Sequence, residues 1–246
     1  AVDGRSGEVL PWNPNPNYEV NTIALDGNTA FVGGAFIRIG GSDRYLAAAV
    51  DLASGLATNW NAHIGNRRRE YWEPDPHVKA LMVRGSIVYI GGLLDSLGGQ
   101  YRSGLGAVSL RDGQVTTWDP RVSGAYPGTY VRALAARGDT IYAGGYFSTV
   151  GGVPRICLAG LSASTAVPTE WNPKPNDEVD ALALDADHIY VGGYYHTLGP
   201  WQVRNNLAAF DLTTGRPTDW NPDPNGIIVY ALKEKDGIVY AGGEFT

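Results

Sequence analysis

The stretch Ile141-Tyr142-Ala143-Gly144-Gly145 decides the fold, because its pattern recurs along the whole chain. An apolar strand pattern runs into a pair of glycines at five places, and the first glycines are spaced 58, 53, 48 and 50 residues apart: Gly33, Gly91, Gly144, Gly192 and Gly242. A tryptophan keeps the same rhythm, with spacings of 48, 58, 53 and 49 residues between Trp12, Trp60, Trp118, Trp171 and Trp220. Two independent markers with one period indicate five structural repeats of about fifty residues.

Each repeat has the pattern of four short strands, which we name A to D. Strand A (residues 20–25, 78–83, 131–135, 179–184 and 229–233) precedes a turn rich in Gly, Asn and Asp, residues that suit a tight hairpin. Strand B runs into the glycine pair, and glycine inside a strand indicates close approach of another backbone or a large side chain. Strand C covers residues 46–51, 105–109, 158–161 and 207–211, and strand D carries the tryptophan.

Four antiparallel strands repeated in this way favour a β-propeller, in which neighbouring blades cover each other's faces. Residues 1–12 match strands C and D, whereas residues 229–246 match strands A and B. We therefore predict an all-β single domain over residues 1–246: a five-bladed β-propeller of four-stranded antiparallel blades, closed by pairing of the N- and C-terminal segments in one shared blade. A longer array cut within a repeat would have the same two ends.

Composition and charge exclude several classes of partner. The formal net charge is −6, so the chain lacks the overall basic character that favours binding to nucleic acid or anionic membranes. No stretch approaches the roughly 18 apolar residues that a membrane-spanning helix needs. We expect neither a nucleic-acid partner nor direct membrane insertion.

The repeat copies at residues 141–152 (IYAGGYFSTVGG) and 171–179 (WNPKPNDEV) resemble the delta-60 and Rax2-like repeats of bacterial and fungal surface proteins. The likeness covers nearly the whole chain and implies a kelch-like propeller on a secreted or cell-surface protein, usually without catalysis. A weaker likeness joins Ala1-Val2-Asp3-Gly4-Arg5-Ser6-Gly7 and Trp12 to quinoprotein propeller repeats, whose motif places the tryptophan one residue earlier. The chain lacks the set of cofactor residues that such quinone-dependent enzymes carry.

Several repeated polar residues are expected to be structural. The aspartates Asp3, Asp51 and Asp211 stand at turns between strands C and D, where a carboxylate can accept backbone N–H bonds. An arginine stands before strand C in four repeats, where its guanidinium suits loop carbonyls, although a shared anionic site is the alternative: Arg44, Arg102, Arg155 and Arg204.

Catalytic and metal chemistry have weaker signals. Some five-bladed propellers are glycosidases, and a pair of acids drawn from separate blades is the alternative to a non-enzyme: Glu73, Asp75, Asp95, Glu178 and Glu244. The spacing singles out no pair. The four histidines fall at different places in the repeat, and the Asn-Pro loops at 13–17 and 221–225 suit Asx turns better than calcium. We predict no catalytic residue, no metal and no cofactor.

The clearest departure from the repeat is a pair of long connections between strands D and A, at residues 63–71 and 121–130 in adjacent blades. Connections of this kind should share one face with the B-to-C loops. Arginine and aromatic side chains are common interface anchors, so we predict a partner-binding patch there: Arg67, Arg68, Arg69, Tyr71, Trp72, Tyr126 and Tyr130. The expected function is a non-catalytic extracellular or cell-surface module that binds a protein or acts as a scaffold. A glycan-binding propeller and a glycoside hydrolase are the alternatives.

Overall fold

The computed structural model describes residues 1–65, 76–124, 128–199 and 202–245, and these residues form strands, turns and irregular segments without a helix. In these ranges there is accordingly no helix that could cross a membrane. All the strand pairs within the described residues are antiparallel. The prediction of an all-β fold with many small antiparallel sheets is confirmed, and the arrangement is propeller-like.

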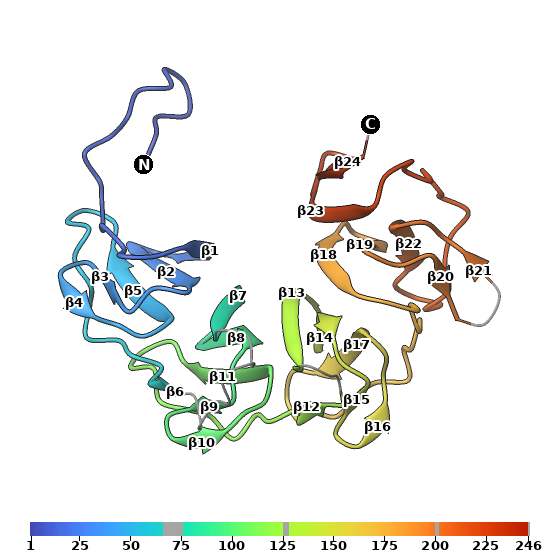
Figure 1. The fold of residues 1–246 in the computed structure, drawn as a ribbon, viewed down its shortest axis with the longest axis horizontal. Helices are drawn as coiled ribbons and strands as arrows, with labels where there is room; N and C mark the ends of the chain where they lie inside the picture. Colours follow the sequence, from blue (N-terminus) through green and yellow to red (C-terminus); the bar gives the residue numbers. More distant parts are fainter. Residues whose placement is uncertain (66–75, 125–127, 200–201, 246) are drawn as a thin grey trace.

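Among the sheets of the described residues, those that contain the A and B strands follow one another around a common centre (Figure 1). Strand A is β1 (Val20–Asp26), β7 (His77–Arg84), β13 (Tyr130–Arg137), β18 (Val179–Leu184) and β23 (Ile228–Lys235). Strand B is β2 (Thr29–Gly34), β8 (Ile87–Leu93), β14 (Thr140–Tyr146), β19 (His188–Gly193) and β24 (Ile238–Glu244). Strand C is β5 (Ala47–Asp51), β11 (Leu105–Ser109), β17 (Leu158–Ser162) and β22 (Leu207–Asp211). The A strands lie on the inner side of this arrangement.

Strand D is shorter than predicted. In each of the first four blades it is reduced to a single bridge to strand C: Val50 to Ala57, Val108 to Val115, Leu161 to Pro168 and Phe210 to Pro217. Proline has no N–H and cannot extend a ladder, which limits the pairing of Pro168 and Pro217. These four blades therefore have three full strands, with a bridge at the predicted place of the fourth strand, whereas β23 and β24 form a two-stranded sheet.

Small hairpins in the B-to-C loops link neighbouring blades. They are β3–β4 (Arg38–Ile39 and Ser42–Asp43), β9–β10 (Ser96–Leu97 and Gln100–Tyr101), β15–β16 (Thr149–Val150 and Val153–Pro154) and β20–β21 (Thr197–Leu198 and Gln202–Val203). Two D-to-A connections pair with the hairpin of the next blade, since β6 (Ile64–Gly65) joins β9 and β12 (Val122–Ser123) joins β15. These pairings place the two kinds of loop on the same side, as the repeat pattern predicts.

Neighbouring blades meet at the first glycine of each pair. We call the space beside this glycine a socket, because the valine of the next A strand fills it. A Cβ added to Gly91 would lie 2.9 Å from Cγ1 of Val131, and one added to Gly192 would lie 2.7 Å from Cγ1 of Val229. The first glycine of every pair up to Gly192 meets the valine of the next A strand in this way. The predicted close approach at these glycines is confirmed, and it explains why no larger residue occupies the position.

The hydrophobic core is divided among the seams between blades. One cluster joins residues of the first two blades, such as Phe31 and Val78, and further clusters fill the following seams. Within each blade the aromatic residue of strand B meets the tryptophan of strand D edge to face, at centroid distances of 5.2, 5.0, 5.1 and 5.2 Å: Phe31–Trp60, Tyr89–Trp118, Tyr142–Trp171 and Tyr190–Trp220. This repeated contact is the physical role of the tryptophan marker.

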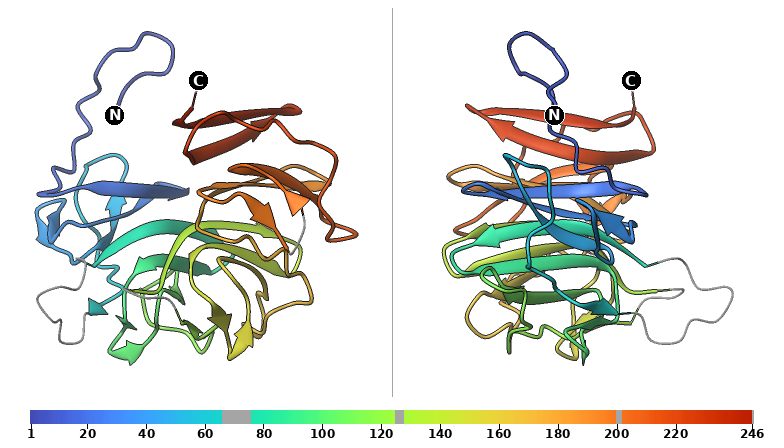
Figure 2. Two further views of the ribbon diagram at one scale, coloured as in Figure 1. Left: turned by 45° about the vertical axis from the view of Figure 1, so that its right-hand side comes forward. Right: turned by 90° about the vertical axis from the view of Figure 1, so that its left-hand side faces the viewer.

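The predicted shared blade is not formed in this structure. Residues 1–12 make a bridge of their own, from Val2 to Val9, and β24 pairs only with β23 within the described residues. Figures 1 and 2 show these two units apart from each other. The socket of Gly242 is empty, with nothing within 4 Å of an added Cβ, and Val20 is 39% exposed. The valine-in-glycine contact that joins the other blades is thus missing between the two ends.

Candidate functional site

Every A strand carries a β-bulge at the same position of the repeat. The register with strand B shifts around one residue in each strand, so that this residue is extra and has no partner across the ladder. The five extra residues are an amide, an ammonium, a guanidinium, a carboxylate and a phenol: Asn21, Lys79, Arg132, Asp180 and Tyr230. Each is preceded by valine and followed by alanine or threonine. The framework is repeated, whereas the residue that it presents changes from blade to blade.

These five side chains line one cavity of about 400 Å³ between the A strands. We call it the axial cavity. Leucines of the same strands, Leu81, Leu134, Leu182 and Leu232, complete its wall. A bulge often turns a side chain toward a functional site, and here it brings five different polar groups to one space.

Arg132 holds the charged half of the axial cavity together. Its Nη1 donates to Oδ1 of Asp180 at 2.9 Å. Its Nε forms an ion pair with Oε1 of Glu178 at 2.6 Å, but the angle at this contact does not meet the requirement for a hydrogen bond. The guanidinium also lies 4.9 Å from the ring centroid of Tyr130. The other carboxylate oxygen of Asp180, Oδ2, is buried and has no hydrogen-bond partner.

The other half of the axial cavity contains the ammonium group of Lys79, whose positive charge is only weakly compensated. Lys79 Nζ donates to Asn21 Oδ1 at 3.1 Å, and Asn21 Nδ2 donates to the carbonyl of Val78 at 3.2 Å. Burial, reinforced by the like charge of Arg132, lowers the pKa of Lys79. On the far side Tyr230 donates to Glu244 at 2.8 Å. The cavity thus presents a cation near one wall and a buried carboxylate oxygen near another.

Burial and crowding of like charge shift the carboxyl groups. The pKa of Glu178 rises to about 7, first because the side chain is buried and then because Asp180 is close, and these effects outweigh Arg132. Burial raises the pKa of Asp180 as well. One guanidinium shared by two buried carboxylates leaves part of their negative charge uncompensated.

Stability should therefore fall as the pH rises from 5 to 8. The folded state binds the Glu178 proton more tightly than the unfolded chain, so the stabilisation present below the unfolded pKa of about 4.5 is lost as the pH passes about 7. The raised pKa of Asp180 acts in the same direction. We expect a loss of roughly 2 kcal/mol in the free energy of unfolding, measured by urea titration at each pH.

Glu178→Gln should flatten this pH profile, whereas Glu8→Gln, on the exposed N-terminal segment, should leave it unchanged. A stability that rises between pH 5 and 8 in the wild type would show that Glu178 is ionised throughout.

Most of the predicted partner patch lies outside the described residues: Arg67, Arg68, Arg69, Tyr71, Trp72 and Tyr126. Tyr130 is described, and it does not belong to an open loop. It is half-buried at the start of β13, stacked on Tyr146 at 5.7 Å and facing Arg132. The structure therefore places Tyr130 within the β13–β14 hairpin, which pairs the two tyrosines across the sheet, and beside Arg132.

The candidate acids are not brought together as a pair. Glu73 and Asp75 lie outside the described residues, Glu244 binds Tyr230, and Glu178 stands beside Asp180. Asp95 belongs to the loop of the second blade, where its carbonyl accepts from the Arg102 amide at 2.9 Å. Sequence reasoning missed Lys79, Arg132 and Asp180. Their signal was available as a polar position of changing chemistry between the valine and the alanine or threonine of each A strand.

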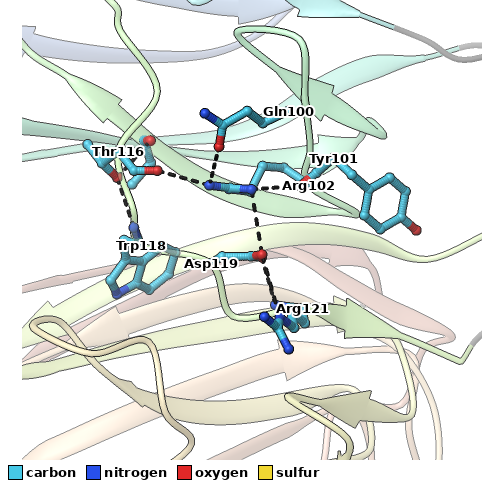
Figure 3. Close-up of polar contacts among 8 residues, drawn as sticks. Gln100, Tyr101, Arg102, Thr116, Trp118, Asp119 and Arg121 are labelled. Carbon is cyan, nitrogen blue, oxygen red and sulfur yellow. Dashed lines mark hydrogen bonds and ion pairs between the residues drawn. The ribbon is translucent and has the colours of Figure 1, made fainter.

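The repeated arginines bind backbone carbonyls. In each case Nη1 donates to the preceding residue and Nη2 to a threonine fourteen positions ahead, as with Arg102 and the carbonyls of Tyr101 (2.7 Å) and Thr116 (2.9 Å) in Figure 3. Arg44, Arg155 and Arg204 make the same two contacts. Arg102 adds an ion pair of 3.5 Å with Asp119. These contacts hold the B-to-C loop against strand D.

The repeated aspartates bind the turn that follows them. Oδ1 of Asp3, Asp51 and Asp211 accepts from the two backbone amides and the hydroxyl that come next, and these bonds lower the pKa of all three. No group of three or more His, Cys, Asp or Glu side chains within the described ranges is placed to hold a metal ion.

The tryptophans join one blade to the next. The indole Nε1 of Trp12, Trp60 and Trp118 donates to the last carbonyl of strand C in the following blade, at 3.1, 2.9 and 3.0 Å: Asp51, Ser109 and Ser162. Trp171 departs from this rule. Its Nε1 is buried and has no hydrogen-bond partner.

Comparison with known proteins supports the fold alone. No protein-family model matches the sequence, and no curated protein matches it. Among solved structures, the computationally designed protein Ika8 is similar, with 16% identity and a TM-score of 0.54 over 94% of this chain and 70% of Ika8.

Two structures of an extracellular domain from B. thetaiotaomicron, described as part of a one-component and of a hybrid two-component system, are also similar. Both have 16% identity, and their TM-scores are 0.59 and 0.61. They match 95% of this chain, which spans only 27% of theirs.

Proposed function

We propose that this chain is a non-catalytic binding module of a secreted or cell-surface protein, and that it receives a segment of a partner protein in the axial cavity. One observation carries the proposal: five equivalent bulge positions hold five different polar residues in an otherwise repeated framework. A purely structural role would be served by one residue type at all five positions. A single asymmetric ligand requires different groups around it.

The chemistry of the cavity favours a ligand with both donors and acceptors. Lys79 can donate further bonds beyond the one to Asn21, and the carboxylate of Asp180 and the phenol oxygen of Tyr230 are acceptors that line the same cavity. A peptide segment offers both, through its backbone and polar side chains. The volume of about 400 Å³ fits a few side chains, so a loop or chain end would enter while the rest of the partner stays outside.

The extracellular setting rests on the resemblance to delta-60 and Rax2-like repeats and is compatible with the extracellular domains that share the fold. A five-bladed closed ring, with the two terminal segments in one blade, would complete the wall of the axial cavity, and we keep it as part of the proposal. A hydrolase is disfavoured because Glu178 and Asp180 share one arginine on the same side, whereas glycosidase acids flank the bond to be cleaved.

The test is selection from a phage-displayed random peptide library on the immobilised chain. Peptides that bind the axial cavity should lose at least tenfold in affinity with Lys79→Met or Asp180→Asn, measured by calorimetry on the synthetic peptides. Lys233→Met is the matched control, because this lysine is exposed on β23 and does not line the cavity. Circular dichroism of each variant confirms folding.

Failure to enrich peptides, or binders that tolerate all three substitutions, would contradict the proposal. Binding of saccharides from a glycan array that is lost with Lys79→Met would instead assign the axial cavity to a glycan.

A further inference from the structure

The charged side chains of the axial cavity differ in how much of each is exposed. Arg132 exposes 32% of its side chain, whereas Asp180, which lines the same cavity, exposes only 3%. Glu178, the other carboxylate that pairs with Arg132, exposes 16%. The two acids are thus more deeply buried than the arginine that they contact. Within this cluster the guanidinium is the charged group that a ligand can reach most easily.

Lys79 is the second cation of the wall and stands on β7, which lies beside β13 (Figure 1). Its side chain is half-buried, and Nζ donates to Oδ1 of Asn21 at 3.1 Å. None of the ion pairs between described residues includes Lys79. An ammonium can donate three hydrogen bonds, so Lys79 has donors left for a ligand.

The two cations of the wall repel each other. Burial first, and then the positive charge of Arg132, lower the pKa of Lys79, and Glu19 and Asp180 oppose this effect only in part. An anion that contacts both cations would offset their repulsion and supply the negative charge that Lys79 lacks. This half of the axial cavity is therefore arranged to receive negative charge.

The charge balance favours an anion with a single charge. When all four groups are ionised, Lys79 and Arg132 offset Glu178 and Asp180, and protonation of Glu178, whose pKa is about 7, leaves one positive charge in excess. A carboxylate carries one negative charge, whereas a phosphate group on a side chain carries about −1.5 to −2 at pH 7. A carboxylate also has two oxygens, so it can accept from an ammonium and a guanidinium together.

Apolar side chains stand next to both cations. Leu81 and Leu134 follow Lys79 and Arg132 by two positions and line the same cavity. A peptide carboxylate has carbon atoms beside it that can pack on these leucines, which a small inorganic anion lacks.

We propose that the partner segment enters the axial cavity with a carboxylate, and that Lys79 and Arg132 bind this group between them. The inference rests on the proposed function, because it names the group of the peptide that the cavity recognises. The carboxylate can belong to an Asp or Glu side chain or to the C-terminus of the partner chain.

Three random peptide libraries on phage distinguish these two sources. The first contains all residue types without a free C-terminus, the second is the same but lacks Asp and Glu, and the third lacks Asp and Glu but ends in a free C-terminus. The first or the third should yield peptides whose binding depends on Lys79, and the second should yield none. Binders from the third library would identify the C-terminal carboxylate as the group that is bound.

Calorimetry on the selected peptides tests the contact itself. Exchange of the acid for an amide, at the side chain or at the C-terminus, should weaken binding to the wild type by at least about tenfold. On Lys79→Met the same exchange should matter much less, whereas Lys79→Arg should retain the preference for the acid. Lys233→Met, at an exposed lysine of β23 that does not line the cavity, should behave as the wild type does. Circular dichroism verifies that each variant is folded.

Peptides that lose affinity with Lys79→Met but tolerate the exchange of acid for amide would overturn the carboxylate and leave the peptide-binding function intact. An equal preference for the acid in the wild type and in Lys79→Met would place the carboxylate elsewhere and also overturn the inference. If none of the three libraries yields a binder, both proposals are wrong.

Discussion

Gly91→Val is expected to lower the free energy of unfolding by about 3 kcal/mol, at the upper end of the cost of overpacking a core. A Cβ at this position lies 2.9 Å from Cγ1 and 3.2 Å from the carbonyl oxygen of Val131. Val131 is fully buried, so its side chain cannot turn away, and its backbone oxygen is fixed in the next blade. The two blades must separate to admit the new side chain. Urea titration followed by circular dichroism measures the effect.

Gly242→Val is the matched control, since it is the same substitution at the same place of the fifth repeat. Nothing lies within 4 Å of an added Cβ there, and valine suits a strand better than glycine. The open arrangement of this structure predicts unchanged or slightly higher stability, whereas the closed ring that we propose predicts a loss. A loss comparable with that of Gly91→Val would show that Val20 fills the Gly242 socket in solution, and therefore that the ring is closed. If Gly91→Val left the free energy of unfolding unchanged, the close packing of Val131 against Gly91 would be wrong.

Arg102→Met is expected to cost about 3 kcal/mol, the other large effect. The Arg102 side chain is only 8% exposed and donates to two backbone carbonyls, and it also faces Asp119 at 3.5 Å. Methionine preserves much of the volume but none of the donors, so the carbonyls of Tyr101 and Thr116 lose their donor, and Asp119 keeps only its contacts with Arg121.

Arg121→Met provides the comparison within the same network (Figure 3). Arg121 contacts the same carboxylate at 3.7 Å, but its side chain is 80% exposed, so the substitution should cost less than about 0.5 kcal/mol. Thermal unfolding of both variants measures the difference. Equal effects would mean that Arg102 acts mainly through Asp119 and not through the carbonyls.

Much of the fold could be predicted because each repeat carries the same residues at the contacts between strands and blades. The glycine pair indicated a close approach, and the structure supplies Val131 against Gly91. The turn chemistry after Asp51 and Asp211 was likewise readable, since carboxylate, amide and hydroxyl stand at fixed short spacings. Repetition turns a weak local signal into a strong one.

The remaining features could not be predicted from the repeat pattern, because they depend on strand pairing or on residues that differ from one repeat to the next. The bulge that presents Arg132 and Asp180 is defined by pairing between strands, and alternation along one strand does not reveal it. The length of pairing between strands C and D is also set by the folded structure, and the sequence pattern around Trp171 does not show that it is limited to a single bridge. The apolar pattern places Tyr130 in the loop before strand A, whereas β13 begins one residue earlier than this pattern indicates.

The unfilled contact between Gly242 and Val20 also limits the symmetry of any self-association. One end of the array offers a socket and the other a side chain, so the two end faces differ and neither complements itself. A dimer in which two like end faces meet would leave both contacts unmade. Contact through these faces would be heterologous, each added copy leaving one new face of each kind free, and the product would be a closed oligomeric ring or an open filament.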